Sequence, residues 1–180
     1  HEVINFATIK NRSVNTYYLT IQGNFTNNGT VTNNVYDFNL YITGNLTNNG
    51  VWTNQTTNMS GNVNQFISMT QPFEGGNFVR IAANGRLKAT TDLSFNNTVI
   101  TLNYDTLEFT TGNAISMNGG YVSPGVIYKS ALPALLVTSE NGNYFYDLVL
   151  DSPESILYGS FLIYGNGSKL KHEVTNFGTI

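Results

Sequence analysis

The chain has no cysteine, only four prolines and few charged residues. Without cysteine it forms no disulfide bonds and no thiolate metal sites. The absence of cysteine does not distinguish a secreted from an intracellular protein, because a chain of 180 residues can bury a core without disulfides. Its eight basic residues and net charge of −3 argue against the basic face that a phosphate backbone requires, so we expect no nucleic-acid partner. No apolar run approaches the length of about 18 residues that a spanning helix needs, and we expect no membrane span.

Asparagine, threonine, glycine and aromatic residues are abundant instead. Amides and hydroxyls carry most of the polarity, which favours turns and strand surfaces over helices. Residues 19–39, LTIQGNFTNNGTVTNNVYDFN, are followed directly by LYITGNLTNNGVWTNQTTNMS, and ten of the 21 positions are identical. A short fixed period predicts structural units that stack on one another.

The apolar positions of this repeat predict columns of buried side chains. Within each unit a Leu-x-Ile alternation places two apolar side chains on one side of a strand. The same frame extends back to the first residues of the chain. The predicted columns are Leu19 with Leu40, Ile21 with Ile42, Phe25 with Leu46, and Ile9 with Val31 and Trp52.

Asparagines precede glycine at the corners of the repeat. Asn27 and Asn28, like Asn48 and Asn49, belong to Asn-Asn-Gly tripeptides, which are turn signals because asparagine and glycine tolerate positive φ. Asparagines stacked at one corner can form a ladder in which each amide donates to its copy in the next turn. A second amide column is predicted two residues after the last apolar one, at Asn11, Asn33 and Asn54.

These patterns predict an all-β parallel β-helix, or β-solenoid, with turns of about 21 residues. A β-sandwich or jelly roll is the alternative, because Asn-Asn-Gly between apolar strands also indicates a hairpin. We expect one solenoid segment over residues 1–180, with regular turns in 1–60, irregular turns and loops in 61–140, and strands in 141–171. Within the irregular part, residues 122–137 are apolar with two prolines, which favours a loop or a short helix.

The chain opens with HEVINFATI and closes with HEVTNFGTI, identical at seven of nine positions. Residues 172–180 then start the next copy of a large repeat, or both nonapeptides are equivalent turns of one stack. We favour the large repeat, and the start at His1 indicates a segment of a longer protein. A turn that recurs at the far end predicts head-to-tail assembly with copies of the same chain.

The segments LTIQGNFTNNGTV, LYITGNLTNNGVW and YFYDLVLDSPESILYGSFLIYGNGSKL resemble the Asn/Gly/Thr-rich β-solenoid repeats of large secreted or surface-attached bacterial proteins of the adhesin and fibre type. The resemblance covers the first 60 and the last 40 residues and includes no catalytic motif. It implies an extracellular or cell-surface location and a structural or adhesive role. It specifies no ligand.

The acidic residues offer little for catalysis. Asp147 and Asp151 share one side of a predicted strand, with Glu154 nearby, and such a group could bind Ca²⁺ or act as the acid and base of a polysaccharide lyase or hydrolase. Asp105 and Glu108 do not even share a side. We interpret all five as solvated charges, and expect no enzyme activity, no metal and no cofactor.

The histidines and the aromatic residues can likewise be interpreted as structural or as ligand-binding residues. His1 and His172 are the only histidines, too few for a metal site, and we interpret them as corner residues beside a glutamate. The aromatic side chains either pack within and across strands or form a face on which sugars stack, which makes a carbohydrate-binding module the alternative function. These are Tyr17, Tyr18, Tyr144, Phe145, Tyr146, Tyr158 and Tyr164.

Asn-x-Ser/Thr triplets, the acceptor pattern for N-glycosylation, recur along the chain. A chain rich in asparagine and threonine produces several of them by chance, and those at predicted turns already have a structural explanation. Glycosylation is therefore a hypothesis that depends on the host. The acceptor positions are Asn11, Asn24, Asn28, Asn45, Asn54, Asn58, Asn96 and Asn166.

Overall fold

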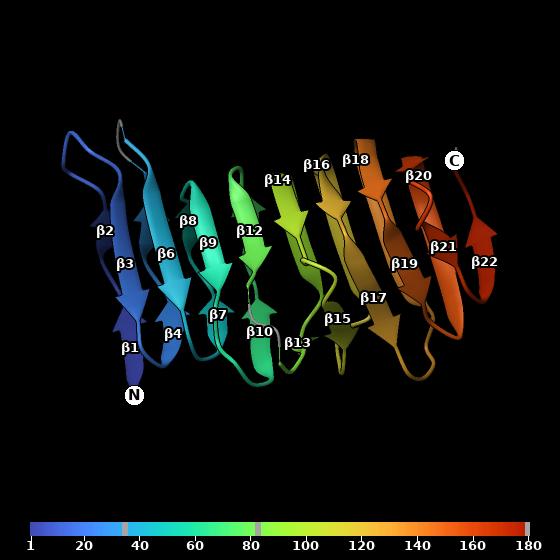
Figure 1. The fold of residues 1–180 in the computed structure, drawn as a ribbon, viewed down its shortest axis with the longest axis horizontal. Helices are drawn as coiled ribbons and strands as arrows, with labels where there is room; N and C mark the ends of the chain where they lie inside the picture. Colours follow the sequence, from blue (N-terminus) through green and yellow to red (C-terminus); the bar gives the residue numbers. More distant parts are fainter. Residues whose placement is uncertain (34–35, 82–83, 179–180) are drawn as a thin grey trace.

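The computed structural model describes residues 1–33, 36–81 and 84–178, with the backbone alone for residue 123 and residues 140–144. These residues form 22 β-strands and no helix, and the chain winds through about eight turns (Figure 1). Every pair of neighbouring strands is parallel. The predicted β-solenoid is confirmed, and the sandwich alternative is wrong because it would require antiparallel ladders.

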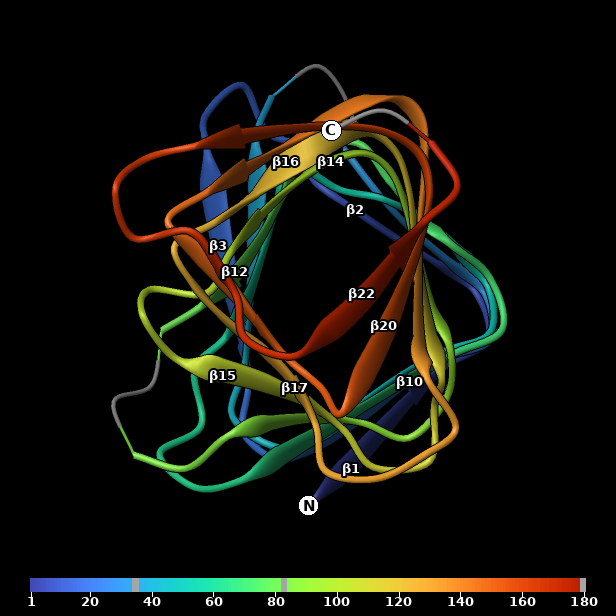
Figure 2. The same ribbon diagram turned by 90° about the vertical axis from the view of Figure 1, so that its right-hand side faces the viewer.

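The solenoid has three faces, wound around a common core (Figure 2). The first face is a nine-stranded sheet to which each turn contributes one short strand. Its strands are β1 (Glu2–Asn5), β4 (Asn24–Asn27), β7 (Leu46–Asn48), β10 (Gln65–Met69), β13 (Leu87–Ala89), β15 (Thr106–Phe109), β17 (Gly125–Lys129), β19 (Leu148–Asp151) and β21 (Lys169–Leu170).

The second and third faces are separate in the early turns and joined in the later ones. The second face begins with β2 (Thr8–Lys10), β5 (Thr30–Thr32), β8 (Val51–Thr53) and β11 (Phe73–Glu74). The third face begins with β3 (Tyr17–Ile21), β6 (Phe38–Ile42), β9 (Thr56–Met59) and β12 (Asn77–Arg80). Each later turn covers both faces with one long strand: β14 (Leu93–Thr101), β16 (Ala114–Ser123), β18 (Leu135–Tyr146) and β20 (Glu154–Tyr164). The last strand, β22 (Glu173–Asn176), pairs with the first part of β20 and so lies on the second face.

Glycine allows the long strands to bend between the second and third faces. Gly120 and Gly159 have φ of 89° and 97°, a left-handed conformation that other residues rarely adopt. A Cβ atom on Gly159 would lie 1.7 Å from the carbonyl oxygen of Ser139 in the turn before. At these two positions the turn can stack on the one before it because the residue has no side chain.

The predicted columns lie in register on adjacent strands. Leu19 is opposite Leu40 and Ile21 is opposite Ile42, and the other pairs match in the same way, with Phe25 opposite Leu46 and Val31 between Ile9 and Trp52. Matched residues follow one another along the axis at the spacing of parallel strands, about 4.8 Å.

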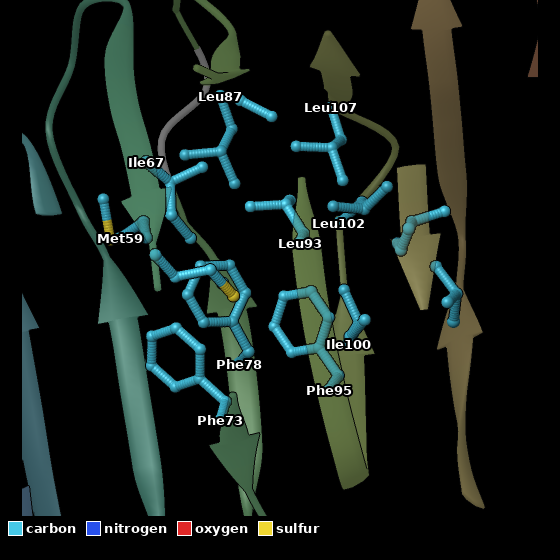
Figure 3. Close-up of a cluster of buried hydrophobic side chains, with 14 of the residues drawn as sticks. Met59, Ile67, Phe73, Phe78, Leu87, Leu93, Phe95, Ile100, Leu102 and Leu107 are labelled. Atoms are coloured by element: carbon cyan, nitrogen blue, oxygen red, sulfur yellow. The ribbon is translucent and has the colours of Figure 1, made fainter. Parts of the chain in front are cut away.

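Aromatic rings fill the middle of the core. The Trp52 ring lies 4.9 Å from Phe73, which stacks on Phe95 at 5.6 Å and also contacts Phe78. Figure 3 shows the three phenylalanines beside the aliphatic side chains of the neighbouring turns. The indole Nε1 donates to Asn54 Oδ1 over 2.7 Å, so the one polar atom of the tryptophan is paired although the ring is buried.

A ladder of buried asparagines runs along the corner between the first and second faces. Asn5 donates through Nδ2 to Oδ1 of Asn27 over 2.8 Å, and Asn27 donates in the same way to Asn48 over 2.9 Å. Each Oδ1 also accepts a backbone N–H two residues later, from Ala7, Gly29 and Gly50 respectively. Asn28 and Asn49 form an exposed pair beside it, in which Asn49 donates to Asn28 over 3.0 Å.

The middle of the chain continues the same coil. Residues 61–81 and 84–140, expected to hold irregular turns and loops, contribute paired parallel strands, in which Ile67, Ala89, Phe109 and Lys129 succeed one another on the first face and the register between β16 and β18 shifts after Met117. A loop or short helix is expected at residues 122–137, but only residue 124 and residues 130–134 lie outside strands, and the others belong to the end of β16, to β17 and to the start of β18. Their alternating burial, with Ile127 and Val137 inside, explains the apolar composition that suggested another structure.

Candidate functional site

The first turn leaves the edges of β1, β2 and β3 unpaired. Side chains that belong to inner columns are open to solvent here, because no turn lies beneath them. Val3, opposite buried Phe25, is 42% exposed, and Leu19, opposite buried Leu40, is 38% exposed. The prediction that Leu19 is buried is therefore wrong, and for the same reason Ile9 is only partly buried.

The last turn leaves a similar edge at β21, β22 and the end of β20. Leu170 is 39% exposed although its partner Leu150 is buried, and Val174 packs against the core while remaining partly accessible. On the outer surface, Phe177 stacks on Tyr158 with ring centroids 5.0 Å apart. Both ends of the described chain thus present partly exposed members of apolar columns.

The two nonapeptides have the same local structure on different faces. In each, a short strand leads into a corner where an asparagine Oδ1 accepts the N–H two residues later: Asn5 from Ala7 over 3.0 Å, and Asn176 from Gly178 over 3.1 Å. Ala7 lies under Gly29 at the corner between the first and second faces, whereas Gly178 lies over Gly159 at the bend between the second and third. The last two residues of the second copy are outside the described ranges.

This placement corrects the idea that the nonapeptides are equivalent turns of one stack. They do not share a column, because β1 pairs in the first face and β22 in the second. The 171 residues between their first residues carry the chain through about eight turns and one further face.

The acidic residues near the C-terminal end do not form a cluster. Asp147 immediately precedes β19 and Asp151 ends it, so the two are roughly 13 Å apart at about 3.3 Å per residue. Lys171 Nζ donates to Asp151 Oδ2 over 2.7 Å, and His172 Nε2 lies 3.0 Å from Oδ1. The hydrogen bond from Lys171 does most to hold the pKa of Asp151 below its usual value, burial opposes this effect, and the hydrogen bond with His172 lowers the pKa further. In the ranges that the structure covers, no three acidic or histidine side chains gather as metal ligands would.

His1 and Glu154 also lie outside any such cluster. His1 is at the opposite end of the solenoid from His172, and Glu154 starts β20 on the second face. Glu108 pairs with Arg86 over 3.0 Å on the surface.

Sequence reasoning missed the most buried charged side chain among those that the structure describes, that of Arg80, which has an accessibility of 0%. Its Nε donates to Asp105 Oδ2 over 2.7 Å, and its Nη atoms donate to Gln65 Oε1 and to several carbonyl oxygens, including that of Gly61 at 3.2 Å. Arg80 comes two residues after inward-facing Phe78 on β12, so both side chains lie on the same side of the strand, and this parity is the one signal that could have revealed it. The guanidinium group of Arg80 thus forms hydrogen bonds with corner residues of neighbouring turns.

The aromatic residues considered as a sugar-stacking face differ in their exposure to solvent. Phe145 is buried, and the side chain of Tyr144 lies outside what the structure describes. Tyr17 and Tyr18 are exposed at the N-terminal end, where they line a hollow with Arg12. The others, Tyr146, Tyr158 and Tyr164, are each about half exposed.

Burial divides the glycosylation candidates. Asn11, Asn54 and Asn58 are 2% to 5% exposed, and their Nδ2 atoms donate to carbonyl oxygens, for example from Asn54 to Phe38 over 3.1 Å. Because Nδ2 is the atom that carries an N-linked glycan, these three positions are incompatible with glycosylation in this fold. The side chains at the five other positions are at least partly accessible: Asn24, Asn28, Asn45, Asn96 and Asn166.

Comparisons of the chain with protein-family models, with curated proteins and with solved structures found no match. The described residues include no helix long and apolar enough to cross a membrane.

Proposed function

We propose that this chain is a structural repeat unit of an extracellular fibre or adhesive stalk, which assembles end to end with its own copies and catalyses no reaction. The observation that supports the proposal is the recurrence of the opening nonapeptide, HEVINFATI, as HEVTNFGTI one face further along the same parallel coil. Each end exposes strand edges and the last members of apolar columns, among them Val3 and Leu19 at one end and Leu170 at the other.

The parallel arrangement gives this assembly a direction. Because all strands run in the same sense around the axis, the N-terminal edge of one copy can pair with the C-terminal edge of another as consecutive turns do. Such a contact joins two different surfaces, and repeating it without closure generates a filament. The extracellular and adhesive part of the proposal rests on the resemblance of the Asn/Gly/Thr-rich segments to surface-protein repeats.

The offset between the two nonapeptides determines how successive copies would be rotated and displaced along the axis. If residues 172–180 begin the next covalent copy, each unit of 171 residues advances the chain by eight turns and one face. Successive copies are then rotated by roughly a third of a turn, and their rise is on the order of 40 Å at about 4.8 Å per turn.

The test is to measure self-association of the chain by sedimentation and electron microscopy. We expect oligomers that lengthen with concentration, and we expect V3K combined with L19K to abolish them by placing charge on the N-terminal edge. V51K combined with F66K is the matched control, because Val51 and Phe66 are similarly exposed but lie on the third and fourth turns. A chain that stays monomeric at high concentration, or end variants that assemble as the control does, would overturn the proposal.

A further inference from the structure

A hollow of about 500 Å³ opens on the side of the solenoid, at the corner where the third face leads into the first. Tyr104 comes from the corner before β15, Tyr146 is the last residue of β18, and Asp147 lies between β18 and β19. The corner between them holds Gly125, which has no side chain, so a gap remains between the two tyrosines. Asn166 lies beside the hollow in the following corner.

The backbone at this corner adopts an unusual conformation. Four non-glycine residues in the described chain have a left-handed backbone, and three of them are here: Asn103 at φ 52°, Tyr104 at 65° and Asp147 at 48°. A bulky residue such as tyrosine is rarely found in this region, and strained residues of this kind concentrate at ligand sites. The strain orients the side chains of Tyr104 and Asp147 at the hollow that they line.

The side chains at the hollow are available to a ligand. Tyr104 is 80% exposed and Tyr146 is 50% exposed. Asp147 accepts the N–H of Gly167 at Oδ1 over 2.9 Å, whereas its Oδ2 has no hydrogen-bond partner among the described residues. Gly165 makes room for this carboxylate, because a Cβ there would lie 2.1 Å from Oδ1. None of the described side chains that line the hollow is basic.

We propose that this hollow binds a neutral saccharide. The faces of the two tyrosine rings offer apolar surfaces against which the C–H faces of a pyranose ring pack, while Asp147 Oδ2 and the Asn166 amide bond to hydroxyl groups. The volume is within the usual range of ligand sites, about 300–1,000 Å³. An acidic sugar is disfavoured, because the unpaired Asp147 carboxylate would repel it and no cation is present to compensate. The site lies on the side of the solenoid and does not depend on end-to-end assembly.

The test uses the monomeric fraction of the chain on an array of neutral and uronic-acid oligosaccharides, followed by calorimetry with the strongest neutral binder. We expect Y104A and Y146A each to weaken binding about tenfold, which corresponds to about 1.4 kcal/mol. Y104F keeps the ring and should bind within about threefold of the unmodified chain. D147N should weaken binding and reduce the discrimination against uronic acids.

Y121A is the matched control, because Tyr121 is an exposed tyrosine of β16 that does not line the hollow. Circular dichroism establishes that each variant keeps its fold. The proposal is overturned if the folded chain binds no neutral oligosaccharide at millimolar concentration, if binding survives in both Y104A and Y146A, or if Y121A loses it equally. V3K with L19K should bind sugar normally, which separates a failure of this site from a failure of assembly.

Discussion

Asn27 donates through its Nδ2 to Oδ1 of Asn48, one turn further along the solenoid, over 2.9 Å, and both side chains are fully buried. A buried amide is tolerated inside an apolar core only when its hydrogen bonds are made. Stacking the same residue in successive turns satisfies this condition repeatedly, because each asparagine offers both a donor and an acceptor along the axis.

Replacing Asn27 with alanine should therefore be costly. The change leaves the N–H of Gly29 and one bond of Asn5 Nδ2 without their acceptor, and the lost buried bonds should lower the free energy of unfolding by about 1–3 kcal/mol. Urea denaturation measures the loss. N28A, on the exposed pair beside the ladder, should change stability by less than about 0.5 kcal/mol, and equal effects of the two variants would contradict a role for the buried ladder.

R80M should be the most destabilising of the charge substitutions. It leaves Asp105 and several buried carbonyl oxygens without their donor, and breaking a buried pair in this way costs about 3–5 kcal/mol. R86M removes the exposed ion pair with Glu108 and should cost less than about 1 kcal/mol. Chemical denaturation of both variants provides the comparison, and an R80M chain as stable as R86M would show that the buried guanidinium is dispensable.

The carboxyl group of Asp151 should titrate below the ordinary aspartate pKa of about 3.9, because Lys171 and then His172 stabilise its charged form. A pKa that is lower in the folded chain contributes stability above the unfolded value, and this contribution disappears as pH falls through the folded value. NMR titration of the side-chain carbon measures the midpoint. K171M should raise the midpoint toward the ordinary value, and a midpoint at or above 3.9 in the unmodified chain would refute the assignment.

A chain of two consecutive copies, residues 1–171 followed by residues 1–180, should form one continuous solenoid. The junction buries the apolar columns that a single copy leaves open, so the two-copy chain should melt at a higher temperature than the single copy. A matched chain with a Gly/Ser linker of about ten residues at the junction disturbs the phase and should lose most of this gain. In a structure of the two-copy chain, the second β1 should pair with β20, and pairing with β19 or β21 would exclude the rotated arrangement.

The early turns could be predicted from sequence because their columns hold like residues, as with Ile21 and Ile42 or Asn27 and Asn48. The middle could not, because its columns mix unlike residues: Ala89, Phe109 and Lys129 succeed one another, and the shared property is burial rather than identity.

Features that depend on position in space were also missed. A column in the sequence does not show which of its members lies at an open end, so Leu19 was expected to be buried. Charged residues are normally exposed, and the side of β12 that Arg80 shares with Phe78 was the one sign of its place inside. The hollow between Tyr104 and Tyr146 forms only when corners about 40 residues apart are stacked two turns from each other.

The hydrogen bonds between turns run parallel to the long axis of the solenoid, which has a mechanical consequence. A force that pulls the two ends of the solenoid apart therefore breaks the backbone hydrogen bonds of one turn at a time. It does not load the hydrogen bonds of many strands simultaneously in shear. Phe25 and Leu46 are opposite each other and 21 residues apart, so the release of one turn supplies roughly 70 Å of extended chain. Under tension such a solenoid would lengthen in discrete steps and dissipate energy at each one, while the turns that remain wound keep their structure.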